Sequence, residues 1–185
     1  MNAVFQLWIP ILATAAVIFI ASSLIHMVFK WHNTEYNKLA NEDDVAAALR
    51  AASPQPGQYV FPHCLDMKEM QAEAMQKKYA TGPVGFLTIR ENGPPKMGPA
   101  LRCWFIYCVV VAAIAGCIAM NVFGAGAHGQ RAGCLVGAIS FMTFVGGSVQ
   151  MGIWMGKPWR SVMKEALDGL IYAVISALIF TWLWP

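Results

Sequence analysis

The chain has 185 residues, of which 57% are hydrophobic and only 12% are charged, whereas about a quarter of the residues in ordinary soluble domains are charged. Its formal net charge is +3, but the basic residues are placed as a membrane-topology signal rather than as a nucleic-acid footprint. Five cysteines without a C-x-x-C pair argue against a zinc knuckle or a disulfide framework. The sequence also lacks a P-loop, an H-E-x-x-H or G-x-S-x-G motif and a dinucleotide-binding glycine pattern.

Four apolar runs predict an all-α integral membrane protein with four transmembrane helices. A helix needs about 20 apolar residues to cross a hydrocarbon core about 30 Å thick. The runs cover residues 4–29 and about 103–123, 132–155 and 167–184. We therefore expect a first transmembrane helix in residues 1–29, a cytoplasmic surface segment in 30–102, and transmembrane helices two to four in 103–185.

The segment at residues 30–102 holds most of the charge and too little apolar sequence for a core of its own. Asn41 precedes three acidic residues and Asp66 precedes Glu69 by three positions, so both are expected to cap short amphipathic helices. The second of these helices is expected to run to about Ala80. We expect the segment to lie against the membrane surface or a partner.

The basic residues predict the orientation. Nine lie between the first and second runs and three between the third and fourth, while only Arg131 lies in the remaining loop. With four spans, both basic segments fall on the same side, which the positive-inside rule makes cytoplasmic. The prediction is a multi-pass protein of the bacterial inner membrane with both termini periplasmic.

The expected spans are almost free of charge. No Asp, Glu, Lys or Arg lies between residues 103 and 130 or between 132 and 156, which argues against a pump or an ion-coupled transporter. His26 carries an imidazole that could bind a metal, but no second ligand is expected at its depth. We interpret it as a polar contact at the membrane edge.

Asp168 is the other ionisable residue expected at the membrane edge. It follows Lys164 by four positions, so an ion pair with that lysine is the preferred interpretation. A polar contact inside the bundle or with a partner is the alternative.

The densest group of possible ligands is the stretch F-P-H-C-L-D-M at 61–67. A thiol beside an imidazole can hold a soft metal or act as an activated nucleophile. Adjacent residues of an extended segment point to opposite faces, however, which works against both roles. His63 and Cys64 are therefore the sequence's candidate metal ligands, while no cofactor and no catalytic residue is expected.

Small residues spaced four apart predict close helix packing. They are Ala112 and Gly116 in the second run, Gly133, Gly137, Ser148, Gly152 and Gly156 in or just after the third, and Gly169 and Ala173 in the fourth. Contacts within one bundle are preferred to an oligomer interface. The loop residues Lys157, Trp159, Arg160 and Lys164 are expected to bind anionic lipid headgroups in addition to setting the topology.

The stretches PGQYVFP at 56–62, GPVGFLTI at 82–89, GKPWR at 156–160, DGLIYA at 168–173 and TWLWP at 181–185 resemble a family of bacterial four-span membrane proteins that carry no assigned function. The resemblance covers most of the chain and implies no site residues.

The uncharged spans and small-residue faces predict a non-catalytic accessory, assembly or scaffold subunit of a larger inner-membrane complex. Its partners would be membrane lipids and other membrane subunits or copies of itself, without nucleic acid. One alternative is a homo-oligomeric channel or transporter for a small neutral solute, and another is a redox or metal-handling protein using His63 and Cys64. For transport, the polar span residues Thr14, Ser22, Ser140, Thr143 and Gln150 would line the path.

Overall fold

The structure is a computed structural model that describes residues 3–185. It is 73% helical, so the predicted all-α class fits. Within the described residues, the strands form one two-stranded sheet. The elements in chain order are η1 (Ala3–Leu7), α1 (Trp8–Ser23), η2 (Leu24–Phe29), η3 (Trp31–Glu35), α2 (Glu42–Ala52), β1 (Gly57–Phe61), α3 (Met67–Gln71), α4 (Glu73–Thr81), β2 (Gly85–Ile89), α5 (Met97–Phe123), α6 (Gly129–Met155) and α7 (Trp159–Trp182).

Three helices of the described chain are long and apolar enough to cross a membrane. They are Phe5–Phe29, Met97–Phe123 and Gly129–Met155. The prediction of a membrane protein with transmembrane helices is thereby confirmed by length and composition. The predicted fourth span lies in α7, whose first half carries Glu165 and Asp168 and which is not one of these three helices.

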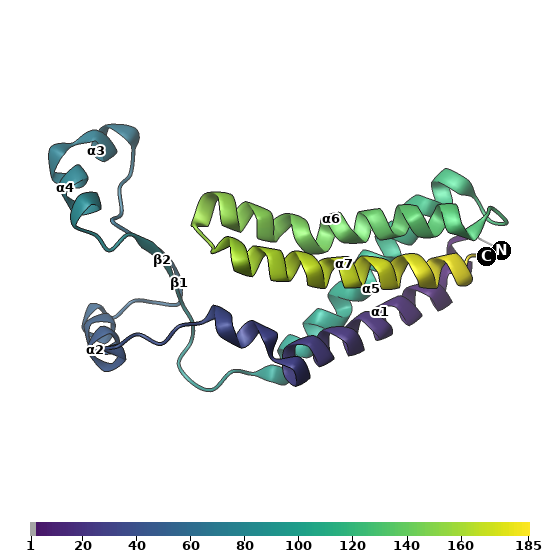
Figure 1. The fold of residues 1–185 in the computed structure, drawn as a ribbon, viewed down its shortest axis with the longest axis horizontal. Coiled ribbons are helices and arrows are strands. Elements are labelled where there is room, and N and C mark those ends of the chain that lie inside the picture. The colour runs from purple at the N-terminus through teal and green to yellow at the C-terminus, as the bar shows by residue number, and fades with distance from the viewer. Residues whose placement is uncertain (1–2) are drawn as a thin grey trace. The chain divides into compact units, whose positions relative to one another are not determined.

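The chain divides into two compact units. The first, which we call the bundle, comprises the described residues up to Tyr36 together with Lys96–Pro185, and the second comprises Asn37–Pro95. In the bundle, α6 and α7 form a hairpin and α1 lies beside α5 (Figure 1). The end of the bundle with the C-terminus also holds the α5–α6 turn, and α1 and α5 diverge from the hairpin toward the opposite end.

Glycines allow α6 and α7 to approach closely. A Cβ added at Gly133 would overlap the Thr181 hydroxyl and the Ala177 carbonyl oxygen, and one added at Gly137 would press on the Ala177 Cβ. The same holds for Gly169 against Val145. These small residues therefore lie at contacts within one bundle, where close backbone approach stabilises helix pairs in lipid.

The other predicted packing positions divide into two groups. Ala112 and Ala173 are buried, Gly116 leaves room for the ring of Phe180, and Gly152 faces Val162. The prediction for Gly156 is wrong, because no atom lies within 4 Å of the position its Cβ would occupy. With φ of 68° it terminates α6 in the left-handed conformation, which glycine adopts without strain.

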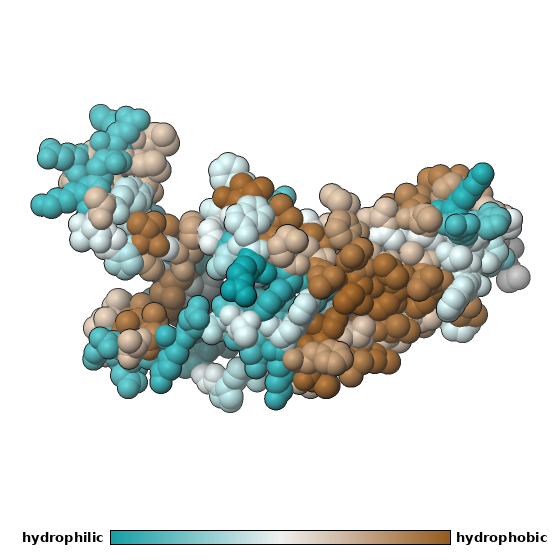
Figure 2. Space-filling view, in the orientation of Figure 1, coloured by the Kyte–Doolittle hydropathy of each residue, from teal (hydrophilic) through white to brown (hydrophobic). Residues whose placement is uncertain are grey.

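The outer surface of the bundle is apolar. Figure 2 shows hydrophobic residues gathered over the bundle helices, and large side chains such as Trp8, Ile20 and Val122 are 61%, 58% and 61% exposed. Exposure of this extent is typical of helices that face lipid and rare on the surface of a soluble monomer.

The unit Asn37–Pro95 holds three short helices and the hairpin, in which Gly57 lies opposite Ile89. Asp66 caps α3 as predicted, since its side chain accepts a hydrogen bond from the Glu69 amide at 2.8 Å. The single helix expected up to Ala80 is wrong, because Ala72 takes an extended conformation and separates α3 from α4. Asn41 occupies the cap position of α2 without a side-chain cap hydrogen bond.

Candidate metal centre and the pocket beside it

The site begins with a reversal of the chain at the end of the first span. After the π-helical turn η2, Lys30 adopts a left-handed conformation with φ of 53°. Because of this reversal, η3 turns back and the rings of His26 and His32 stack, with centroids 4.6 Å apart and planes 8° apart. The expectation that His26 has no companion at its depth is therefore wrong.

Asp168 of α7 is the third member of the cluster. Its Oδ2 atom lies 2.8 Å from Nε2 of His32 and 3.9 Å from Nε2 of His26. One ligand atom from each residue can be chosen so that all three lie within 4.8 Å of one another. Asp168 is only 4% exposed, and its Oδ1 atom has no hydrogen-bond partner among the described residues.

The preferred interpretation of Asp168 as the partner of Lys164 is wrong. The Lys164 ammonium instead donates to the Trp31 carbonyl oxygen at 2.6 Å and to the Thr34 hydroxyl at 2.8 Å, and lies 3.6 Å from the Glu35 carboxylate. The lysine therefore holds η3 against α7. This arrangement leaves Asp168 to face the two imidazoles.

Hydrogen bonds orient both rings. Nδ1 of His26 lies 3.0 Å from the Ser22 carbonyl oxygen and Nδ1 of His32 lies 2.7 Å from Glu35 Oε1. Both oxygens accept, so each Nδ1 donates, and each Nε2 is turned toward Asp168. The His32 Nε2 and the Asp168 Oδ2 lie 2.8 Å apart, which is a hydrogen-bond distance, so these two atoms share a proton that a metal ion ligated by both would replace.

The three side chains fit a divalent transition-metal ion. Imidazole and carboxylate together suit ions such as Zn²⁺, Fe²⁺ and Co²⁺, and a ligating imidazole typically donates its other N–H to a carbonyl or carboxylate oxygen. His26 and His32 have that arrangement here. Within residues 3–185, no other group of three His, Cys, Asp or Glu side chains converges in this way.

The predicted ligands His63 and Cys64 lie in the unit Asn37–Pro95 and are not part of such a group. The Cys64 sulfur lies 3.5 Å from the Tyr79 hydroxyl oxygen, and His63 is exposed. The hydrogen bond with Cys64 raises the pKa of Tyr79 above its usual range. This pair offers too few ligands to hold a metal by itself.

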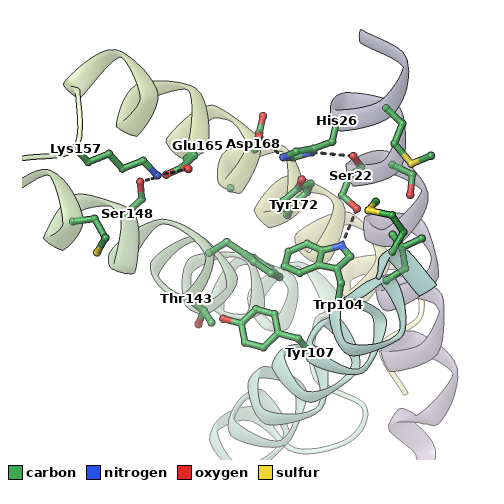
Figure 3. A pocket seen from close by; sticks show the side chains of 17 residues that line it. Ser22, His26, Trp104, Tyr107, Thr143, Ser148, Lys157, Glu165, Asp168 and Tyr172 are labelled. Atoms are coloured by element: carbon green, nitrogen blue, oxygen red, sulfur yellow. Dashed lines mark hydrogen bonds and ion pairs between the residues drawn. The ribbon is translucent and has the colours of Figure 1, made fainter. Parts of the chain in front are cut away.

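A cavity of about 520 Å³ opens beside the cluster, between the α6–α7 hairpin and the ends of α1 and α5 (Figure 3). Its aromatic wall consists of Trp104, Tyr107, Phe144 and Tyr172, whose neighbouring rings lie 5.3–6.1 Å apart. The Trp104 indole donates to the Ser22 hydroxyl at 2.8 Å. Large rings thus lie between α5 and the α6–α7 hairpin here, whereas α5 has Ala115 and Gly116 at the other end of the bundle.

The far end of the cavity is polar. Lys157 and Ser148 both donate hydrogen bonds to the Glu165 carboxylate. Burial raises the pKa of Glu165, but these two donors outweigh it, so the pKa lies below its usual range. Lys157 and Lys164 therefore have partners within the fold, while Trp159 and Arg160 are exposed and their contact with lipid headgroups stays a prediction.

The five polar residues proposed to line a transport path do not form one stripe. Thr14 and Ser140 are fully buried, and their hydroxyl oxygens have no partner among the described residues. Thr143 donates to the Ile139 carbonyl oxygen, and Gln150 is exposed. Of the five, Ser22 and Thr143 line the cavity.

Sequence reasoning missed His32, Glu35 and Glu165. His26 and His32 are six positions apart, a spacing that puts two residues on different faces of a continuous α-helix. His26 and His32 come together only because the helix ends before Lys30, where the chain reverses. No family model, curated protein or solved structure matches the chain, so the function is inferred from the geometry of this site.

Proposed function

We propose that this protein is a multi-pass membrane protein that binds a divalent first-row transition-metal ion through His26, His32 and Asp168. The observation that carries the proposal is the buried Asp168 carboxylate, whose Oδ1 atom has no partner among residues 3–185 while its Oδ2 faces two Nε2 atoms. A buried polar atom left without a partner costs about 1–3 kcal/mol. A cation ligated by this carboxylate would remove that cost.

The ligand set narrows the class of ion. Two imidazoles and one carboxylate without a thiolate favour Zn²⁺, Fe²⁺, Co²⁺ or Ni²⁺ over soft Cu⁺ and over Ca²⁺ or Mg²⁺. Three protein ligands leave at least one coordination position open, as in metal sites that bind a further ligand. His26 and Asp168 both line the cavity, so the open position would face it.

The proposal includes the finer topology predicted from the sequence. We take residues 167–184, most of which lie in α7, as a fourth membrane span beside α6, with residues 30–102 and the α6–α7 loop on the cytoplasmic side of a bacterial inner membrane and both termini periplasmic. The support is the distribution of the 13 Lys and Arg residues, of which Arg131 alone lies on the opposite side. The metal would then lie near the cytoplasmic edge of the membrane.

Metal titration tests the site. The purified full-length chain, stripped of metal with a chelator in a mild detergent, should bind one equivalent of Zn²⁺. One equivalent of Co²⁺ bound in its place should give d–d absorption bands in the visible range. His32→Ala should weaken binding by about 100-fold or more, because a direct ligand is lost and even the loss of a group that only orients a ligand costs about 10–100-fold. The matched controls are His63→Ala and Cys64→Ser, which alter the predicted alternative ligands and should leave the affinity unchanged.

The opposite pattern would contradict the proposal. Zinc binding that survives His32→Ala but disappears with Cys64→Ser would move the site to the unit Asn37–Pro95. An absence of stoichiometric binding by the wild-type protein would remove the metal function altogether.

The accessory-subunit role and the absence of catalysis stay predictions from the sequence. Purification from native membranes in a gentle detergent addresses the first of them. Co-purification of other membrane subunits in fixed ratio is expected, and a lone monomer would contradict it.

A further inference from the structure

The cavity beside the metal ligands has the features of a second binding site. We propose that it takes a single-chain anionic amphiphile, such as a fatty-acid carboxylate, with the head between the metal ion and Lys157 and the chain along the aromatic wall. This inference rests on the proposed metal site.

The size and lining of the cavity fit a small apolar body. Its volume of about 520 Å³ lies in the range of pockets that enclose drug-sized molecules. Met27, Met97, Leu101 and Met151 line it together with the four aromatic rings. Methionine side chains are flexible and polarisable, so they adapt to a chain of variable shape.

The charges predict the sign of the head group. Lys157, Glu165 and Asp168 line the cavity, so one cation faces two carboxylates when no metal is bound. A divalent ion on Asp168 reverses this balance, because its charge exceeds that of the carboxylate that holds it. An anion is therefore favoured in the metal-loaded protein and disfavoured in the stripped protein.

The head group of the amphiphile can contact two groups, the metal ion and the Lys157 ammonium. Oxygen ligands suit the open coordination position of the ion. The Lys157 ammonium carries three N–H donors, and its hydrogen bond to Glu165 uses one of them. Glu165 and Asp168 are less than one helical turn apart on α7, and both face the same cavity. The carboxylate of the amphiphile, lying between Lys157 and the ion on Asp168, can therefore accept a hydrogen bond from Lys157 and ligate the ion at the same time.

The access route agrees with a lipid-soluble ligand. The cavity lies where α1 and α5 diverge from the α6–α7 hairpin. The outer faces of these helices are apolar and exposed. An amphiphile in the surrounding membrane can therefore enter without crossing water.

Calorimetric titration of the zinc-loaded and the stripped full-length protein, in nanodiscs of zwitterionic lipid, tests the inference. The probe is decanoate, with decanol as the uncharged match and inorganic phosphate as the free anion. Decanoate should bind the loaded protein about tenfold more tightly than the stripped protein, within the range typical of coupled sites. By reciprocity, saturating decanoate should tighten zinc binding by the same factor, and decanol should show neither effect.

Two variants locate the ligand. Lys157→Gln should lower decanoate affinity about tenfold and leave zinc affinity unchanged, whereas Arg160→Gln, an exposed charge outside the cavity, should change neither. Met97→Trp, at the exposed start of α5, should fill part of the cavity and abolish decanoate binding while zinc still binds.

The outcomes separate the two proposals. Normal zinc binding with equal decanoate affinity in the loaded and stripped protein overturns the anionic-amphiphile inference alone. Phosphate binding that displaces decanoate assigns the site to a free anion and overturns it as well. Loss of zinc binding in the wild-type protein overturns the metal site on which the inference rests.

Discussion

The two ends of the bundle are built from the same four helices but are packed in opposite ways. At the end near the C-terminus, Leu7, Ala115 and Phe180 are fully buried in one cluster, and glycines bring α6 against α7. At the end near His26, α6 and α7 also stay in contact, with Gly169 against Val145, but Trp104, Phe144 and Tyr172 lie between the hairpin and α5. Their rings fill part of the space where α1 and α5 diverge from the hairpin, and a cavity remains.

The difference teaches that the small residues of α5, such as Ala115 and Gly116, decide where α1 and α5 close against the α6–α7 hairpin. Close backbone approach in lipid depends on glycine and alanine at the interface. A pocket with polar groups can then exist at the open end without loss of the whole fold, because the closed end supplies the packing. We call these parts the closed end and the open end.

The largest effect on this contrast is expected from Gly133→Ala at the closed end. The new Cβ would overlap the backbone of α7 at Ala177 as well as the Thr181 hydroxyl, so the helices must separate. We expect a loss of about 3 kcal/mol or more in the free energy of unfolding, measured by denaturation in mixed micelles. Gly147→Ala is the matched control, since no atom lies within 4 Å of its Cβ position and helix propensity favours alanine by up to about 1 kcal/mol.

Equal stability of the Gly133→Ala and Gly147→Ala variants would show that the α6–α7 contact does not depend on close approach. The closed end would then be held by other contacts, and its contrast with the open end would lose its basis.

The closed end was more predictable from the sequence than the open end. Hydrophobic runs predict long helices, and spacing by four predicts which glycines meet a neighbour, because both are local patterns. The helices extend beyond the predicted membrane spans: α5 begins at Met97 and α7 at Trp159, before the spans expected from 103 and 167. Their first turns carry basic residues that a hydropathy criterion excludes from a span.

The candidate site depends on a contact that no local pattern contains. His32 and Asp168 are 136 positions apart in the chain, and they meet only because Lys30 reverses the backbone after a π-helical turn. A non-glycine residue in the left-handed region is uncommon and is stabilised by its surroundings. The reversal therefore follows from tertiary packing, including the bonds of Lys164 to η3.

At the open end, Asp168→Asn should have the next largest effect. The sequence interpretation predicts a nearly silent change, whereas the cluster predicts a loss of zinc affinity of about 100-fold or more, because the anionic ligand is removed and even the loss of a group that only orients a ligand costs about 10–100-fold. The apparent dissociation constant from a competition titration with a chromophoric chelator measures this. The stability of the metal-free variant should stay close to that of the wild type, since the closed end is unchanged.

A silent Asp168→Asn variant would restore the membrane-edge interpretation and remove the metal site. A large loss of stability without metal would show instead that Asp168 supports the fold of the open end directly.

A smaller effect, of the opposite sign, is expected from Ser140→Ala on α6. The Ser140 hydroxyl oxygen is buried and has no partner in the described part of the chain. Its removal should raise the free energy of unfolding by about 1 kcal/mol. Ser176→Ala is the matched control, because the Ser176 hydroxyl is equally buried but donates to the Tyr172 carbonyl oxygen at 2.8 Å, so its loss should be neutral or destabilising.

If Ser140→Ala destabilised the protein as much as Ser176→Ala, the hydroxyl would have a partner, such as water in a hydrated path. That result would favour the transport alternative.

The smallest effect is expected from the pH dependence of the Lys157–Glu165 pair at the open end. Donors from Lys157 and Ser148 hold the pKa of Glu165 below its ordinary value of about 4.5. A carboxyl group with a lowered pKa in the folded state contributes stability above its ordinary pKa, and this contribution is lost as the pH falls through the folded-state value. Because Lys157 and Glu165 are 28% and 33% exposed, we expect less than about 1 kcal/mol.

The difference in melting temperature between wild type and Glu165→Gln isolates this contribution from the other carboxylates. It should be largest at neutral pH and disappear as the pH falls through the lowered pKa of Glu165 in the folded state. Glu73→Gln, on the exposed surface of α4, is the control and should show no such change. A difference that grows on acidification would mean that Glu165 is held in its neutral form, so that Lys157 rather than the pair would set the charge of the open end.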